Sequence, residues 1–331
     1  MRPVLEALPE NERGAALLTV LLLVAVMSVI AATALERVTL ATRLTGNAGI
    51  QAQARAYADA AETIARLRIA DLVAAQPGKT TLAGGWLGTP QQLPVPGGTA
   101  TARVTDSGNC FNLNSVVQGG DADLKFRPAG INQFQALMKA LAVDPRQAQF
   151  IATSLADWID SDAIPLPGGG EDEVYLRLPQ PYRTSNRLMS DPSELRAVQG
   201  VTPAVYSVLR PWTCALPISD LSPINVNTLL PQQAPLLAML LDGKASVEQA
   251  RQWLAQRPAE GYGSLPAFWA VPSRAGFAPT DEVSTQTKLT SRWFAVNIDV
   301  ELGGMDMSET ALIDAQSTPA KLVYRRWGED I

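Results

Sequence analysis

The sequence contains no histidine among its 331 residues. This absence excludes His-dependent catalytic triads and His-based metal centres, and it removes the commonest general base of enzymes. Only two cysteines are present, which is too few for a zinc or iron–sulfur site but enough for one disulfide. An enzymatic function therefore has few suitable side chains to rely on.

Positive charge is also scarce. Lysine and arginine total 27 against 32 aspartates and glutamates, so the net charge is −5 and the pI is about 5.0. Because binding to a phosphate backbone needs a basic surface, this balance argues against nucleic acid as the main partner. Apolar residues make up 47% of the chain and charged residues 18%, which excludes a mainly disordered protein. The length suits two domains, or one domain with a large insertion.

The N-terminus holds one long apolar run. Residues 15–35 carry no charge, and a helix of that length spans about 30 Å at roughly 1.5 Å per residue, enough to cross a bilayer core. Three interpretations are open: a secretory signal cut near residues 32–34, an uncut signal anchor, or an anchor preceded by a short polar leader that ends at Gly14. A secretory signal is cut after its apolar region, whereas this glycine stands before it.

Helical character continues beyond the apolar run to about residue 75. There is no proline from residue 10 until Pro77, and Tyr57, Ala61, Ile64 and Leu67 are spaced as one apolar stripe. The two halves together predict a single helix of about 60 residues, about 90 Å long.

A helix that is apolar in front and amphipathic behind resembles that of type IV pilins and type II secretion pseudopilins. The resemblance implies that a prepilin peptidase cuts after Gly14 and methylates the new N-terminus at Ala15. Members of that family usually carry Glu at the fifth mature position, where this chain has Thr19. A subunit without this Glu fits the tip of a filament, where no subunit lies ahead to pair with it. Alternatively, Thr19 is simply a residue that a membrane helix tolerates.

Beyond the helix, the pattern predicts a sheet that begins early and finishes late, with a helical block in between. The Gly- and Pro-rich residues 76–98 are expected to form a loop, residues 100–104 a strand, and residues 110–115 the second strand of a hairpin. Helical spacing is found at residues 131–141, 145–159, 192–199, 203–209, 231–241 and 246–256. Closing strands are predicted at residues 291–302, 305–314 and 320–327.

Six short motifs follow one another in an order that resembles a single family. They are CFNLNS at 110–115, DWIDSD at 157–162, GEDEVY at 170–175, PYR at 181–183, SEL at 193–195 and INVNT at 224–228. Together they are similar to the minor pseudopilin K family of the type II (general) secretion pathway, over essentially the whole chain. That family is also the exception at the fifth mature position, which agrees with Thr19.

The resemblance implies an α+β fold. A pilin-like long N-terminal helix would pack on an antiparallel sheet, with a large inserted α-helical domain that contains helix-hairpin-helix-like units. The expected order is a leader at 1–14, the long helix at 15–75 with its membrane span at 15–35, the first part of the pilin-like α/β domain at 76–127, the inserted α-domain at 128–217, and a second helical unit with the closing sheet at 218–331.

The resemblance further implies a non-enzymatic subunit with one helix in the bacterial inner membrane and its soluble part in the periplasm. We expect it at the pseudopilus tip, in a complex with minor pseudopilins I and J and without a nucleic-acid partner. There it would initiate assembly and limit pseudopilus length during export of folded periplasmic proteins. The alternative is a membrane-anchored periplasmic protein for DNA uptake or carbohydrate hydrolysis.

The strongest chemical signal is an acidic segment in the helical block. Six carboxylates fall within 17 residues, interrupted by proline and glycine: Asp157, Asp160, Asp162, Glu171, Asp172 and Glu173. Oxygen ligands on a turn-rich segment suit Ca²⁺, and crowded carboxylates without a cation raise one another's pKa. The family resemblance also associates calcium with this domain. The alternatives are a solvated acidic loop, or an acid–base pair for glycoside hydrolysis with Trp158, Tyr175 and Tyr182 stacking on a sugar.

Residues 193–216 have the pattern of a helix-hairpin-helix, with Gly200 in the turn, and residues 224–228 begin what resembles a second copy. Such hairpins often bind DNA phosphates. Here the turn at residues 199–202 has no lysine beside it, so a structural or protein-binding role is favoured.

Cys110 and Cys214 complete the candidate residues. In an oxidising periplasm they are expected to form a disulfide that ties the sheet to the α-domain. The alternative is a pair of buried thiols, which behave as small apolar side chains.

Overall fold

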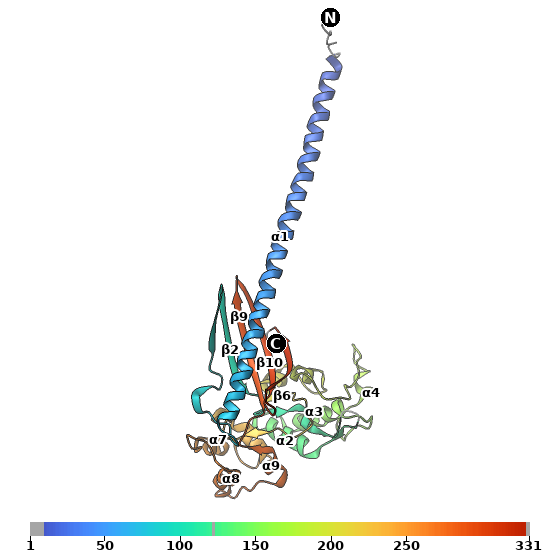
Figure 1. The fold of residues 1–331 in the computed structure, drawn as a ribbon. Coiled ribbons are helices and arrows are strands. Elements are labelled where there is room, and N and C mark those ends of the chain that lie inside the picture. Colours follow the sequence, from blue (N-terminus) through green and yellow to red (C-terminus); the bar gives the residue numbers. More distant parts are fainter. Residues whose placement is uncertain (1–9, 121–122, 329–331) are drawn as a thin grey trace.

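The computed structural model describes residues 10–120 and 123–328, so most of the predicted leader lies outside the described residues. The first element is a single helix, α1 (Glu10–Ala75), of 66 residues. The predicted continuous helix is therefore confirmed (Figure 1). Serine and threonine hydroxyls along its apolar half, including Thr19, donate to backbone carbonyls three or four residues earlier, which satisfies them without water.

Among the described residues, one helix is long and apolar enough to cross a membrane. It is the Gly14–Ala75 part of α1, with a mean hydropathy of 2.8 in its most apolar window. The rest of the chain covers none of that window. This agrees with the single predicted span at residues 15–35.

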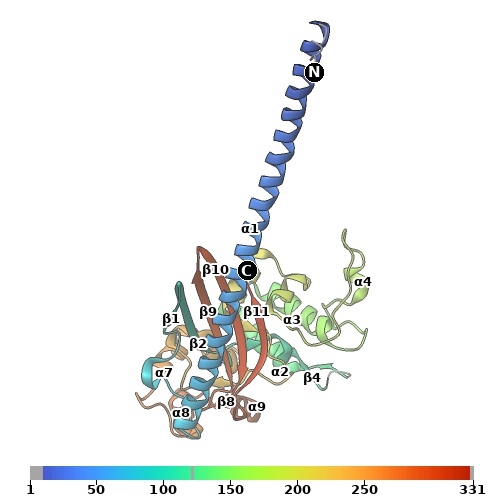
Figure 2. The same ribbon diagram turned by 45° about the horizontal axis from the view of Figure 1, so that its top comes forward.

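The C-terminal part of α1 lies across a five-stranded antiparallel sheet of order β1-β2-β9-β10-β11 (Figure 2). Its strands are β1 (Gln91–Val95), β2 (Gly98–Asp106), β9 (Trp293–Leu302), β10 (Met305–Asp314) and β11 (Lys321–Trp327). Strand β2 pairs with β9, so the sheet joins two distant parts of the chain as predicted. The loop predicted at residues 76–98 is wrong in part, because it contains β1. The Pro94 in this strand is tolerated because β1 is an edge strand.

The face of α1 that packs on the sheet is built from small side chains. The residues buried there are Ala54, Ala58, Ala61, Ala65 and Ile69. They meet alternate residues of the central strands, such as Val296 and Ile298. The short alanine side chains bring the helix backbone close to the sheet.

The apolar stripe predicted on α1 was therefore wrong in its orientation. Ala61 is buried, but Ile64 and Leu67 are 43% and 59% exposed, and Tyr57 is only half-buried. Two neighbouring faces of this helix segment are apolar, and the alanine face rather than the bulkier one contacts the sheet.

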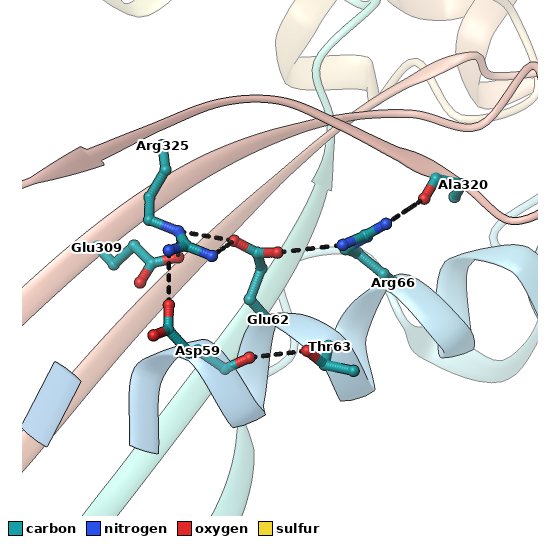
Figure 3. A network of polar contacts seen from close by, with 7 residues as sticks. All are labelled: Asp59, Glu62, Thr63, Arg66, Glu309, Ala320 and Arg325. Atoms are coloured by element: carbon teal, nitrogen blue, oxygen red, sulfur yellow. Dashed lines mark hydrogen bonds and ion pairs between the residues drawn. The ribbon is translucent and has the colours of Figure 1, made fainter. Parts of the chain in front are cut away.

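One charged side chain crosses this apolar layer. Glu62 of α1 is buried, and one of its oxygens accepts from Nε and Nη2 of Arg325 on β11 at 2.9 and 2.6 Å (Figure 3). Asp59 and the buried Glu309 of β10 also pair with Arg325, at 2.6 and 3.3 Å. Burial is the main reason why the pKa of Glu309 is raised to about 7. Arg66 adds a second link from α1 to the sheet through the carbonyl of Ala320.

Two helical units are inserted between β2 and β9. The first spans residues 111–214, and its main elements are β3 (Phe111–Asn112), α2 (Pro128–Ala140), α3 (Pro145–Ile159), α4 (Asp172–Tyr175), the 3₁₀ helix η3 (Pro192–Ala197), α5 (Pro203–Leu209) and β6 (Thr213–Cys214). The second spans residues 224–288, and its main elements are β7 (Ile224–Asn225), α6 (Ala234–Leu240), α7 (Val247–Ala255), α8 (Leu265–Ser273), α9 (Asp281–Gln286) and β8 (Thr287–Lys288).

Shorter elements complete the description. They are η1 (Ala83–Gly85), η2 (Leu113–Val116), β4 (Val117–Gln118), β5 (Lys125–Phe126), η4 (Arg210–Trp212) and η5 (Pro231–Gln233). The six predicted helical segments all contain helix, although residues 192–199 form a 3₁₀ helix and residues 231–241 are split between η5 and α6. Helices α8 and α9 were not predicted.

The hairpin strand predicted at residues 110–115 was wrong. Only Phe111 and Asn112 are extended, and they pair in parallel with β6 rather than with β2. The reason lies in the asparagines: the Asn112 side chain accepts from the N–H groups of Asn114 and Leu216, which turns the chain into η2. Buried asparagine therefore ends the strand after two residues.

The two units share one design. In each, a two-residue strand opens the unit, four α-helices follow among the described residues, and a two-residue parallel strand closes it. Asn114 exchanges two hydrogen bonds with the backbone of Met189, just before η3. Asn227 does the same with Tyr262, just before α8. The second copy that the INVNT motif suggested is thus present in the structure.

Cys110 and Cys214 form a disulfide with a Cα–Cα distance of 5.9 Å, as predicted. The bond joins the two ends of the first unit beside β3 and β6, rather than the five-stranded sheet to the α-domain as expected, and it closes a segment with a sequence separation of 104.

We call the sheet, the two helical units and the part of α1 that packs on the sheet the head. Replacing both cysteines by alanine should destabilise the head by about 4–5 kcal/mol, because a loop of this length then regains its full freedom in the unfolded chain. Urea unfolding of the detergent-solubilised protein measures the loss. Reductant should move the wild-type midpoint to that of the variant and leave the variant unchanged. Equal midpoints for the oxidised wild type and the variant would contradict the expectation.

Candidate cation site

Most of the acidic segment lies in a connection that is much longer in the first unit than in the second. Between α3 and the Met189 that pairs with Asn114, the chain runs through residues 160–188. The corresponding connection of the second unit, between α7 and Tyr262, is residues 256–261. We call residues 160–188 the insertion. It carries α4, which lies at the outer edge of the head in Figures 1 and 2.

Three of the six predicted carboxylates meet in the insertion. Asp160 caps the C-terminus of α3 and Glu171 precedes α4. One oxygen from each of Asp160, Asp162 and Glu171 lies within 4.8 Å of the others. Asp160 is 1% exposed and Glu171 6%, while Asp162 faces solvent. Within the described part of the chain, Asp160 Oδ1 and Glu171 Oε1 are buried without a hydrogen-bond partner.

This arrangement is electrostatically unfavourable without a positive charge. Burial, and then the neighbouring carboxylates, raise the pKa of Asp160 to about 7 and that of Glu171 to about 7. A buried carboxylate normally has a hydrogen-bond donor or a cation beside it. Oxygen-only ligands of this kind fit a hard divalent cation such as Ca²⁺, which takes six to eight oxygens in flexible geometry.

Asp157 holds the turn that brings Glu171 to Asp160. Its carboxylate is buried and accepts the N–H of Leu166 at 3.1 and 3.2 Å, and the Gly170 N–H as well. Burial raises its pKa to about 6 despite these bonds. A Cβ at Gly169 would lie 2.0 Å from Oδ2, so glycine is needed there. Asp157 thus positions the insertion, with its oxygens already engaged by backbone.

The structure does not bring Asp172 and Glu173 into the cluster. Asp172 accepts from the N–H and hydroxyl of Thr184 and pairs with Arg183, and the Thr184 N–H is the main cause that lowers its pKa. Glu173 pairs with Arg177 one turn along. Successive residues of a helical turn point in directions about 100° apart, so three adjacent acids cannot share one centre.

The three aromatic residues of the sugar-binding alternative pack on one another instead. Trp158 meets Tyr175 and Tyr182 edge-on, at centroid distances of 5.2 and 6.0 Å. Trp158 and Tyr175 are buried, and only Tyr182 is more than one-third exposed. These rings form the small core of the insertion, which does not favour a carbohydrate platform.

The hairpin turn at Gly200 is also occupied by packing. Gly200 has φ +85°, and a Cβ there would lie 2.5 Å from the Phe150 ring of α3. Its carbonyl accepts from Gln147. A turn held against another helix in this way supports the structural role rather than phosphate binding.

The two predicted processing residues, Gly14 and Ala15, lie on the exposed N-terminal part of α1. The buried side-chain oxygen of Gln199, which lies against Gly170, was missed because an isolated glutamine in a hairpin turn gives no signal in the sequence.

Two models of one family, described as type II secretion system protein K, match residues 109–218 and 224–290. The chain is also 36% identical over 323 residues to type II secretion system protein K of Pectobacterium carotovorum subsp. carotovorum, covering 96% of this chain and 97% of the relative. The chain belongs to the type II secretion system protein K family. Protein K of Klebsiella pneumoniae is 35% identical, again over 96% of this chain and 97% of the relative.

A solved structure agrees with this assignment. The crystal structure of the GspK–GspI–GspJ complex from the type 2 secretion system of enterotoxigenic Escherichia coli matches with a TM-score of 0.73 and 30% identity. The match covers 84% of this chain and 96% of that one. The predicted α+β fold of a protein K subunit, a minor pseudopilin, is thereby confirmed.

Removing the charge of Asp160 should stabilise the cation-free protein, and more so at high pH. Its pKa of about 7 in the folded state exceeds the ordinary value of 3.8, so wild-type stability falls as pH rises from about 4 through about 7. In chelator, Asp160→Asn should therefore raise the thermal midpoint more at pH 8 than at pH 5. The exposed Glu173→Gln variant is the control, and the same pH profile for both variants would contradict the expectation.

Proposed function

We propose that this chain is the minor pseudopilin at the tip of the type II secretion pseudopilus. It would initiate assembly with minor pseudopilins I and J and limit pseudopilus length during export of folded proteins. The observation that carries the proposal is the match, over most of both chains, to the protein K subunit of a solved complex with those two proteins. The absence of histidine supports a structural rather than enzymatic role.

The exposed surface of α1 supports assembly beside other helices. Next to the sheet, the helix presents an outward face without charges, formed by Ala52, Ala56, Ala60, Thr63 and Leu67. Small residues of this kind let a second helix approach closely. We infer that helices of I and J lie along this face and along the apolar half above it, and not on Ala61, which faces the sheet.

The shape of the head supports a place at the tip. Two helical units and the insertion widen it beyond what one helix and one sheet require (Figures 1 and 2). Such a head would be difficult to repeat along a closely packed filament, and Thr19 offers no carboxylate to a subunit ahead. We infer that prepilin peptidase cuts after Gly14 and methylates Ala15, and that α1 anchors the protein in the inner membrane with its head in the periplasm.

We also propose that Asp160, Asp162 and Glu171 hold a structural Ca²⁺. The bound cation would supply the positive charge that these buried carboxylates lack. Support comes from the two unpartnered buried oxygens and from the position of the cluster, which joins the first residue of the insertion to Glu171, eleven residues further along.

Leu67→Glu should weaken the complex with I and J by about tenfold or more, because a charge would enter an apolar contact. Sedimentation of the three detergent-solubilised proteins measures it. Leu67→Met is the matched control and should assemble normally. Ala61→Glu should instead unfold the head, since Ala61 is 2% exposed against the sheet. Unchanged assembly of Leu67→Glu would overturn the assignment of this face.

Calcium should raise the thermal midpoint of the head, because a ligand at 100 times its Kd stabilises the native state by about 2.7 kcal/mol. Glu171→Gln should lose most of this gain. Glu173→Gln, two residues away and paired with Arg177, should keep it. Identical midpoints of the wild type in excess calcium and in chelator would show that the cluster is a solvated surface.

A further inference from the structure

The charged cluster between α1 and the sheet carries more negative than positive charge. Three carboxylates face two guanidinium groups there (Figure 3). We call this group the charged joint; its members are Asp59, Glu62 and Arg66 of α1, Glu309 of β10 and Arg325 of β11. If every member is ionised, the charged joint has a net charge of minus one.

The neighbouring strands do not correct this imbalance. Ile298 of β9 stands opposite Glu309, and the other residues of β9 that pack towards α1 are apolar as well. On the other side, Trp327 of β11 stands opposite Glu309. The guanidinium of Arg55 lies over the Trp327 ring, 5.7 Å from its centroid, and its side chain is exposed to solvent. The compensating charge must therefore come from within the charged joint.

Glu309 is the carboxylate that receives no hydrogen bond there. Arg325 directs Nε and Nη2 to Glu62, and its Nη1 pairs with Asp59. Oε1 of Glu309 lies 3.3 Å from Nε, but Nε carries a single hydrogen and Glu62 accepts it. Glu309 is 1% exposed, and within the described chain neither of its side-chain oxygens has a hydrogen-bond partner.

A proton on Glu309 resolves both problems. It makes the charged joint neutral, and it turns one Glu309 oxygen into a donor. The other two carboxylates are better suited to remain ionised, because Glu62 accepts two N–H groups of Arg325 and Asp59 is half-exposed to water. Burial is the largest cause that raises the pKa of Glu309 to about 7; Arg325 opposes the shift, and the charges of Glu62 and Asp59 add to it.

We propose that the charged joint binds one proton, which Glu309 carries and donates to Glu62. The hydrogen bond joins β10 directly to α1, whereas the arginine links α1 to β11. When this proton is lost, a buried negative charge without a donor is left against the helix. The attachment of α1 to the sheet therefore weakens as pH rises through neutrality.

The direction of this effect follows from the two pKa values of Glu309. The ordinary value is 4.5 and the value in the folded protein is about 7, so between them folding takes up a proton. The stability that this group contributes is complete below about pH 4.5 and is lost as pH rises through about 7. Over that interval one proton changes the unfolding equilibrium constant by about tenfold per pH unit.

Urea unfolding of the full-length protein in detergent and chelator tests the proposal. Glu309→Gln keeps the shape and a donor for Glu62 but binds no proton. The unfolding constant of the wild type, divided by that of the variant, should rise by about a hundredfold between about pH 5 and pH 7 and then level off. Other carboxylates with a raised pKa are present in both proteins and cancel in this ratio.

The matched control is Asp306→Asn, an exposed acid on the same strand. Its pH profile should run parallel to that of the wild type. Glu62→Gln is a second test variant, because it leaves the remaining charges balanced without a proton and should also remove the hundredfold change. Parallel profiles for the wild type, Glu309→Gln and Glu62→Gln would overturn the proposal.

Infrared spectroscopy detects the proton itself, since a protonated carboxyl group absorbs at a higher frequency than a carboxylate. The difference spectrum between the wild type and Glu309→Gln at about pH 5 should contain one protonated carboxyl band, which disappears by about pH 9. Asp306→Asn should keep the band, and Glu62→Gln should lack it. A difference spectrum with only carboxylate bands at the lower pH would show that Glu309 is ionised and would overturn the proposal.

Discussion

The close packing of α1 on the sheet is the constraint on which the rest of the molecule depends. One helix forms a wall of the head's core and also extends far beyond it, so its faces must be divided between two tasks. Alanines provide the inner face and let the helix lie near the strands. The Glu62–Arg325 pair fixes the helix against β11, since separating the two would leave the buried Glu62 carboxylate without its partner of opposite charge. The outward face is thereby left free of charge.

The helical units are held to this framework at the far end of the sheet. Asp106, the last residue of β2, is buried, and burial raises its pKa. Its carboxylate accepts from the hydroxyls of Thr228 and Ser291, which join the second unit to the start of β9. Asn225 donates to Ser291 as well. A network of short polar side chains thus connects the sheet to the helices. Its hydrogen bonds fix their relative orientation, whereas apolar packing has no preferred direction.

Much of this was predictable from the sequence. An uncharged apolar run followed by helical spacing without proline predicted the long helix, and turn residues with alternation predicted β9, β10 and β11. The face of α1 was not predictable, because alanine has little hydrophobic signal and only contact with the sheet chooses between two apolar faces. The pairing of β3 with β6 was missed, since it depends on side chains about 100 residues apart.

The acidic segment was identified as a site from the sequence, but the three carboxylates that cluster were not distinguished from the three that do not. Composition alone cannot tell which carboxylates face inward. That choice depends on Asp157 holding the turn at Leu166 and on the 100° rotation between neighbours in α4. The close approach of Gln199 to Gly170 was missed for the same reason, since it depends on where the hairpin lies in the fold.

The repeated asparagine design also bears on how such a head could have arisen. If one helical unit was copied within an ancestral gene, each copy already contained its closing strand and the asparagine that exchanges two hydrogen bonds with the backbone. The second unit has a short connection, residues 256–261, which shows how few residues the design needs at that point. The first copy was therefore free to acquire a long insertion without loss of folding. Descent by duplication would thus have separated the residues under selection for the fold from those under selection for new chemistry.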